Sequence, residues 1–138
     1  MRVLGLDVGS RRIGVAISDP LGVSAQRLTT VVRQDLVRDV QAVATLAVQH
    51  QVETVVVGLP LTMKGTQGTQ ATQVMGFIDA LKPAVSCPVR TIDERLTTAQ
   101  GEQALLALDT SRRKRKHLID QVAAQLILQS YLDASAKA

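Results

Sequence analysis

Apolar and polar positions alternate or cluster along the chain in a way that predicts five strands. Two apolar runs, 3–8 and 13–18, are separated by a Gly-Ser turn and predict a β-hairpin. A third strand is expected at 27–32, where apolar and polar residues alternate. The β-branched run at 53–57 is typical of a strand that is buried on both faces of a sheet. A short fifth strand is expected at 89–92.

Helical periodicity covers most of the remaining chain. Helices are predicted at 34–49, 69–82, 98–108 and 118–134, and Pro83 should end the second of them. The first helix is expected to bury an apolar stripe that consists of Leu36, Val40, Val43, Ala44 and Ala47.

The order of these elements predicts an α/β fold. Three consecutive strands form an antiparallel meander, and each later strand, reached through a helix, should run parallel to the first by a right-handed crossover. The result is one mixed five-stranded sheet with helices on both faces. At this length, residues 1–138 are expected to form a single domain with a sizeable core.

An acid interrupts the first apolar run. Asp7 lies where a buried strand is predicted, and a carboxylate there is costly unless a cation pairs with it. Glu94 follows the fifth strand, and Asp120 is expected in the first turn of the last helix. Functional sites of open α/β sheets lie beyond the carboxyl ends of the strands. Because carboxylates from separate elements hold Mg²⁺ or Mn²⁺ in phosphoryl-transfer sites, these three acids predict a metal site.

Each acid also has a purely structural interpretation. Asp7 could cap the amides of the following turn, and Glu94 could pair with Arg95 at the surface. Asp120 could simply interact favourably with a helix N-terminus. Asp93 is as good a candidate as Glu94 by composition, but strand alternation puts the two on opposite sides, so only one should point into the site.

Basic residues near these acids suggest contacts with phosphate. Arg11 and Arg12, in the hairpin turn, could touch a phosphate or merely neutralise Asp7. The glycine-rich stretch 58–68, which contains Lys64, could hold a phosphate through its backbone amides or be a plain strand-to-helix connection. It lacks the Gly-Lys-Ser/Thr spacing of a Walker A loop.

A basic cluster precedes the last predicted helix. It could be a solvated mobile loop, or it could contact a phosphate backbone beside Asp120. His117 could contact a phosphate or orient a water, although a surface histidine is the simpler interpretation. The net charge of +4 favours polyanionic partners only moderately. The cluster consists of Arg112, Arg113, Lys114, Arg115 and Lys116.

Composition indicates where in the cell the protein works and how it would recognise nucleic acid. Phe77 and Tyr131 are the only aromatic residues, which argues against recognition of single-stranded bases by stacking. The lone Cys87 fits a reducing compartment. No signal peptide and no apolar stretch long enough to span a bilayer are apparent, so a cytoplasmic location without membrane partners is expected.

Four blocks in series resemble the YqgF family of bacterial RNase H-like nucleases, and the resemblance covers nearly the whole chain. The family is described as resolving Holliday junctions and as cleaving pre-16S ribosomal RNA. The resemblance implies a ribonuclease H-like fold, with Asp7, Glu94 and Asp120 as catalytic acids that bind the metal. The blocks are Gly5-Leu6-Asp7-Val8-Gly9-Ser10-Arg11-Arg12-Ile13-Gly14-Val15-Ala16, Gly58-Leu59-Pro60, Asp93-Glu94-Arg95-Leu96-Thr97-Thr98, and Ile119-Asp120 with Ala123-Ala124 and Leu128-Gln129-Ser130-Tyr131-Leu132.

The expected function is therefore that of a nuclease that depends on Mg²⁺ or Mn²⁺ and processes the 5′ end of precursor 16S rRNA, with ribosomal particles as possible partners. A resolvase-like DNA endonuclease and a nucleic-acid-binding module without catalysis are the alternatives. An ATP-dependent phosphotransferase is disfavoured because the chain is too short for the second domain that would enclose ATP. RNA or DNA as substrate, endonuclease or exonuclease mode, and monomer or homodimer stay open at this stage.

Overall fold

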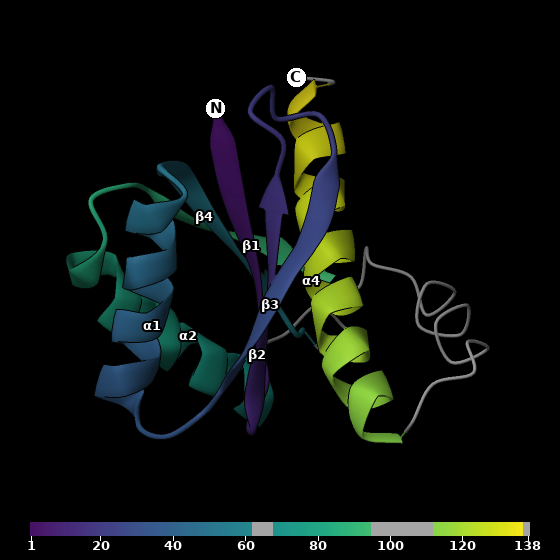
Figure 1. Cartoon of the computed structure of the whole chain (residues 1–138). Coiled ribbons are helices and arrows are strands. Elements are labelled where there is room, and N and C mark those ends of the chain that lie inside the picture. Colours follow the sequence, from purple (N-terminus) through teal and green to yellow (C-terminus); the bar gives the residue numbers. More distant parts are fainter. Residues whose placement is uncertain (62–67, 95–111, 137–138) are drawn as a thin grey trace.

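The computed structural model describes residues 1–61, 68–94 and 112–136, and only the backbone of 112–117. Its strands are β1 (Arg2–Val8), β2 (Arg12–Ser18), β3 (Ala25–Val32), β4 (Val52–Leu59) and β5 (Val89–Asp93). Its helices are α1 (Leu36–Gln49), α2 (Thr69–Leu81), the 3₁₀ turn η1 (Lys82–Ala84) and α4 (Arg112–Ala136) (Figure 1). The helix predicted at 98–108 lies outside the described residues.

The strands form one mixed sheet in the order β3-β2-β1-β4-β5. β1, β2 and β3 pair antiparallel, whereas β4 pairs parallel to β1 and β5 pairs parallel to β4. This confirms the predicted meander followed by parallel crossovers. Because β1 lies in the middle, its apolar side chains are covered on both faces, and Leu4 and Leu6 are completely buried.

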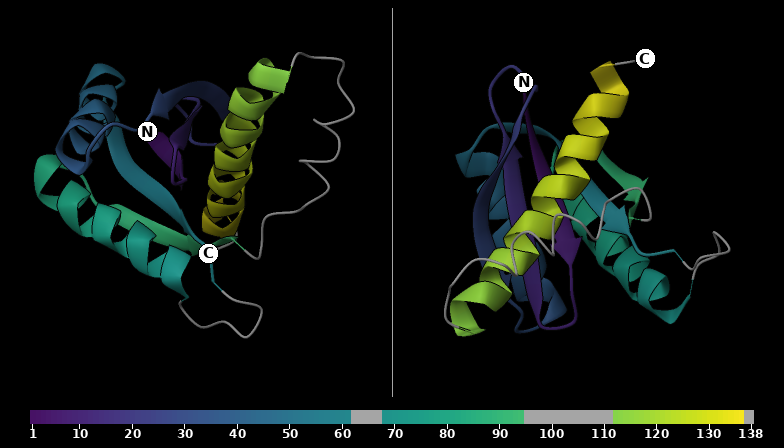
Figure 2. Two further views of the ribbon diagram at one scale, coloured as in Figure 1. Left: turned by 90° about the horizontal axis from the view of Figure 1, so that it is seen from below. Right: turned by 90° about the vertical axis from the view of Figure 1, so that its right-hand side faces the viewer.

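Helices cover both faces of the sheet, as predicted. α1 and α2 lie on one face, and α4 crosses the other diagonally (Figure 2). Alternation along β1 separates the two cores, because Leu4, Leu6 and Val8 belong to the core under α1 and α2, whereas Val3 belongs to the core under α4. By the same alternation, Asp7 lies on the α4 face.

α1 differs from the prediction in its buried stripe. The helix begins at Leu36, after Asp35 caps it by accepting a hydrogen bond from the Arg38 amide at 2.8 Å. Val40 is buried as predicted, but Leu36 is 46% exposed. The prediction was wrong there because the helix instead turns Asp39 inward, where it is only 2% exposed.

Asp39 is buried because Arg33 pairs with it. Arg33 Nε lies 3.0 Å from Asp39 Oδ2, and the Gln34 amide donates to Asp39 Oδ1 at 2.9 Å. The same guanidinium donates through Nη1 to the Gly9 carbonyl at 2.9 Å and lies 5.5 Å from the centroid of the Phe77 ring. One ion pair therefore joins the turn after β1 to the start of α1 and to α2.

α4 begins at Arg112 rather than at residue 118, so the basic cluster is helical. Asp120 consequently lies in the third turn of the helix, and its predicted place in the first turn was wrong. Because Asp120 is not at the start of the helix, the alternative role of interacting with a helix N-terminus does not apply to it. The apolar periodicity missed these turns because Lys and Arg favour helix without contributing an apolar stripe.

Replacing Asp39 should test how much the buried Arg33–Asp39 pair contributes to the free energy of unfolding. Asp39→Ala leaves the Arg33 guanidinium without its carboxylate, and we expect the free energy of unfolding to fall by about 3 kcal/mol or more. Asp35→Ala removes only an exposed helix cap and should cost about 1 kcal/mol. Urea denaturation measures both, and equal losses would show that the Arg33–Asp39 pair is not a major stabilising contact.

Candidate functional site

Asp7 lies between two glycines on neighbouring strands. It pairs with Gly14 in the β1–β2 ladder. On the other side Leu6 pairs with Val57 in parallel register, which sets Gly58 beside Asp7 one residue further on. Neighbouring strands lie about 4.8 Å apart, so the row Gly14–Asp7–Gly58 is short and carries only one side chain. On the α4 face, the two glycines therefore offer no side chain on either side of Asp7.

The backbone of α4 lies directly on one end of this row. A Cβ atom on Gly14 would lie only 1.9 Å from the carbonyl oxygen of Asp120. Two turns along the helix, a Cβ atom on Gly5 would lie 2.7 Å from Leu128 Cβ. The absence of side chains at both glycines lets the helix approach the sheet this closely, and that approach carries Asp120 to the Asp7 row.

Glu94 lies over the other end of the row. A Cβ atom on Gly58 would be 2.7 Å from Glu94 Oε1 and 2.5 Å from Ile127 Cδ1. Asp93 is the last residue of β5, and its backbone pairs with Leu59. Of the two candidate acids after β5, Glu94 is therefore the one whose carboxylate contacts the row that holds Asp7.

The guanidinium of Arg12 forms an ion pair with one of the three acids, Asp120. Arg12 Nε lies 2.5 Å from Asp120 Oδ2, and the two side chains are 27% and 20% exposed. The sequence offered Arg12 as a cation for Asp7, and the ion pair that the structure shows for Arg12 is with Asp120. Arg11 is exposed, and its carbonyl accepts a hydrogen bond from the Arg33 amide at 2.9 Å.

The chemistry of the three acids fits a hard divalent cation, although they do not form a ready-made cluster. Among the residues that the structure describes, no group of three or more His, Cys, Asp or Glu side chains is arranged to hold a metal ion. The Asp120 carboxylate faces Arg12 in this state. Carboxylate oxygens are nevertheless the ligands that Mg²⁺ and Mn²⁺ take, and a positive charge is already stabilised beside Asp120.

The other predicted phosphate contacts are less completely described. Lys64 lies outside the described residues. For the basic cluster and His117 the backbone is described, and it forms the first turns of α4, on the N-terminal side of Asp120. Sequence reasoning missed Arg33 and the three close-packing glycines, although a glycine inside an apolar strand is a known sign of close backbone approach.

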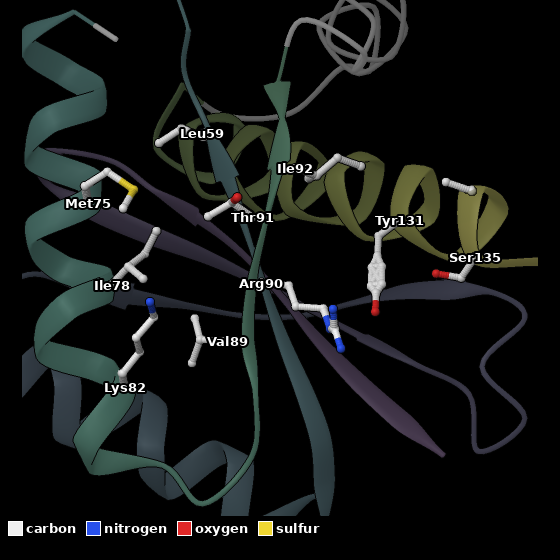
Figure 3. Close-up of a pocket in the computed structure, with 11 residues that line it drawn as sticks. Leu59, Met75, Ile78, Lys82, Val89, Arg90, Thr91, Ile92, Tyr131 and Ser135 are labelled. Carbon is white, nitrogen blue, oxygen red and sulfur yellow. The ribbon is translucent and has the colours of Figure 1, made fainter. Parts of the chain in front are cut away.

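A cavity lies at the β5 side of the sheet. It is an open groove of about 770 Å³ between α2, β5 and α4 (Figure 3). Ile92, one of its lining residues, pairs with Gly58 in the β4–β5 ladder and so adjoins the acid row, whereas Leu59 belongs to the core on the other face. Lys82, Arg90 and Tyr131 also line it.

Comparison with known proteins places this architecture in a family. The family model for RuvX, described as "Holliday junction resolvase", matches residues 1–134. A relative from Clostridium acetobutylicum is 47% identical over 97% of this chain and 99% of its own length, and one from Desulforamulus reducens is 46% identical over 99% and 100%. Both are named "Putative pre-16S rRNA nuclease". The chain belongs to the RuvX family.

RuvX is the family, also called YqgF, that the sequence blocks indicated, and that prediction is confirmed. Its family description and the name of its relatives both denote enzymes that hydrolyse phosphodiester bonds, and this RuvX chain is an enzyme of that class.

Solved structures confirm the predicted ribonuclease H-like fold. RuvC of Thermus thermophilus, in complex with a Holliday junction substrate, superposes with a TM-score of 0.65 at 20% identity, over 100% of this chain and 97% of that one. A fowlpox virus resolvase bound to Holliday junction DNA gives a TM-score of 0.58 at 13% identity, over 98% of this chain and 99% of that one.

In the described part of this RuvX chain, no helix has the length and apolar character needed to cross a membrane.

Two glycine substitutions should separate close helix packing from helix propensity. Gly14→Ala forces a methyl group into the Asp120 carbonyl, so we expect the free energy of unfolding to fall by about 2 kcal/mol or more. A methyl group on Gly76 in α2 meets no atom within 4 Å, so Gly76→Ala should raise stability by about 0.5–1 kcal/mol. Thermal and urea unfolding measure both, and a harmless Gly14→Ala would contradict the packing described here.

Proposed function

We propose that this RuvX-family chain is a metal-dependent nuclease that processes the 5′ end of precursor 16S rRNA. In this proposal Asp7, Glu94 and Asp120 are the catalytic acids and bind Mg²⁺ or Mn²⁺. The observation that carries it is the row Gly14–Asp7–Gly58, with the Asp120 backbone against one glycine and the Glu94 carboxylate against the other. The choice of RNA rests on the name of the relatives.

The fold gives each acid a different kind of support. Asp7 belongs to the central strand, which is held by ladders on both sides. Asp120 is positioned through the backbone of α4, and Glu94 follows the strand that pairs with β4. When bound, the metal would make a water more acidic and balance charge on the phosphate oxygens. The chain's own contribution is to hold three oxygen donors from separate elements against a rigid sheet.

Basic residues would hold the strand during cleavage. Arg11 is exposed next to the turn that follows Asp7, and the first turns of α4 precede Asp120 on the same helix. Precursor rRNA in ribosomal particles, in the cytoplasm, is the partner that this proposal implies. The proposed phosphate contacts are Arg11, Lys64, Arg112, Arg113, Lys114, Arg115, Lys116 and His117.

Holliday junction resolution is the second candidate, and the description of the family model favours it. A resolvase must cut two strands at one junction, which needs two active sites and hence a dimer. The two candidates differ in substrate and in oligomeric state, while the proposed chemistry of the acids is the same.

Asp7→Asn should abolish cleavage while leaving nucleic-acid binding intact. The substitution keeps the size of the side chain and removes the charge needed for the metal, so we expect the cleavage rate to fall by about a hundredfold or more. Asp79→Asn, the same change on the exposed side of α2, should cleave like the wild type. The assay follows a labelled precursor rRNA end with Mg²⁺ or Mn²⁺.

The same assay, extended to single-stranded RNA and DNA and to a four-way junction, distinguishes the candidates. Preferred cleavage of the junction by a dimer would favour the resolvase. If the wild type binds nucleic acid but cleaves none of these substrates, the chain is a binding module without catalysis. An unchanged rate for Asp7→Asn would remove Asp7 from the catalytic acids.

Arg12→Gln should make divalent cations bind more tightly. The guanidinium competes for the Asp120 carboxylate, so its loss should lower the dissociation constant for Mn²⁺ by about tenfold, measured by calorimetry without substrate. Arg38→Gln, a change on the exposed surface of α1, serves as the control and should bind Mn²⁺ like the wild type. Weaker Mn²⁺ binding by Arg12→Gln would mean that Arg12 orients Asp120 instead of competing for it.

A further inference from the structure

We propose that the groove between α2, β5 and α4 binds a single-stranded segment of the nucleic-acid substrate that continues from the scissile bond. The inference rests on the proposed function, and it assigns three further residues to substrate binding: Lys82, Arg90 and Tyr131. None of them is among the phosphate contacts proposed above.

The groove begins beside the acid row. Ile92, which lines the groove, pairs with Gly58 in the β4–β5 ladder and packs against the core under α4, so it lies next to the glycine that contacts the Glu94 carboxylate. Along α4, Tyr131 is eleven residues beyond Asp120, which is close to three full turns and about 16 Å. The two side chains therefore start from the same side of the helix. Ala124 and Ile127, which lie between them on this side, are buried against the sheet, so a strand held at the acids would reach the groove past Ile92 on β5.

The charge of the groove suits a polyanion. Lys82, directly after α2, and Arg90 on β5 are both exposed, and among the described residues that line the groove none is acidic. Figure 3 shows the Arg90 guanidinium extending toward the Tyr131 side of the groove, while Lys82 extends from the α2 side. Lys82 lies on the α2 side of β5 beside the apolar Ile78, and Arg90 lies on the Tyr131 side, so each side of the groove offers a cation for a phosphate.

Tyr131 supplies one flat surface for a base. Its ring is half-buried in the groove, whereas Phe77, the other aromatic residue, is 1% exposed in the core under α1 and α2. With Phe77 buried, Tyr131 is the one aromatic side chain of the sequence on which a base could stack, and it lies in the groove. One stacked base between two phosphate contacts is a common arrangement for binding without strong sequence preference.

A protein strand is the competing occupant. β5 is the last strand of the sheet, so an extended peptide could add to its outer side. Two cations and a tyrosine that converge on an open groove favour a nucleic-acid strand, because strand addition needs only the backbone of β5. Peptide binding is therefore an outcome that the test must be able to reveal.

The chain has one tyrosine, so fluorotyrosine incorporation gives a single fluorine NMR resonance that reports on the groove. In an Asp7→Asn background, which keeps the strand uncut, we expect single-stranded RNA oligonucleotides to shift this resonance saturably. Lys82→Gln and Arg90→Gln should each weaken binding and reduce the slope of log affinity against log salt by about 0.7. Arg38→Gln, on the exposed side of α1, should change neither.

The ring itself is tested by a matched pair. Tyr131→Phe keeps the flat surface and should bind like the parent, whereas Tyr131→Leu keeps an apolar side chain without the ring and should bind about tenfold more weakly. Equal binding by both variants would contradict stacking, and melting temperatures close to that of the parent show that each variant is folded.

Failure of this inference can be told from failure of the proposed function. Suppose that fluorescence anisotropy shows oligonucleotide binding and the wild type cleaves, while the resonance stays fixed and the variants bind normally. The strand then avoids the groove, and the nuclease function stands. A resonance that responds to peptides but not to oligonucleotides would make the groove a protein site. If the wild type neither binds nor cleaves nucleic acid, the proposed function itself is wrong.

Discussion

The close contact between α4 and the sheet is the constraint on which the rest of the structure depends. Glycines at positions 5, 14 and 58 leave the α4 face of three adjacent strands without side chains where the helix and Glu94 approach. A single methyl group on Gly14 would collide with the backbone of Asp120. The same absence of side chains that permits the packing flanks Asp7 with Gly14 and Gly58. Helix packing and the candidate site thus have one common cause.

Two ion pairs, one on each face of the sheet, lie near the hairpin turn that follows Asp7. On the α1 face, Arg33 pairs with the buried Asp39 and holds the Gly9 carbonyl. On the α4 face, Arg12 pairs with Asp120. The first pair is buried and fixes the turn, whereas the second is partly exposed. A buried ion pair is costly to break, and a partly exposed one contributes less to stability.

α4 joins the proposed catalytic region to the proposed strand groove. Asp120 lies in its third turn and Tyr131 three turns later on the same side of the helix. Because the helix packs against β1 and β2 at its glycine contacts, a displacement at Gly14 would move Asp120 directly. Tyr131 packs partly against the same core as Leu128, so the groove and the acids are held by one set of contacts.

Periodicity along the chain determined the strands, their mixed order and the presence of helices on both faces, because a buried strand or helix needs a matching apolar pattern. The motif blocks indicated the family, and the three acids were candidates from their positions at strand and helix ends. Only the tertiary structure decided that Arg12 pairs with Asp120, that Asp39 is buried in place of Leu36, and that α4 begins at Arg112. These features depend on contacts between residues far apart or on polar helical turns, and neither leaves an apolar period in the sequence.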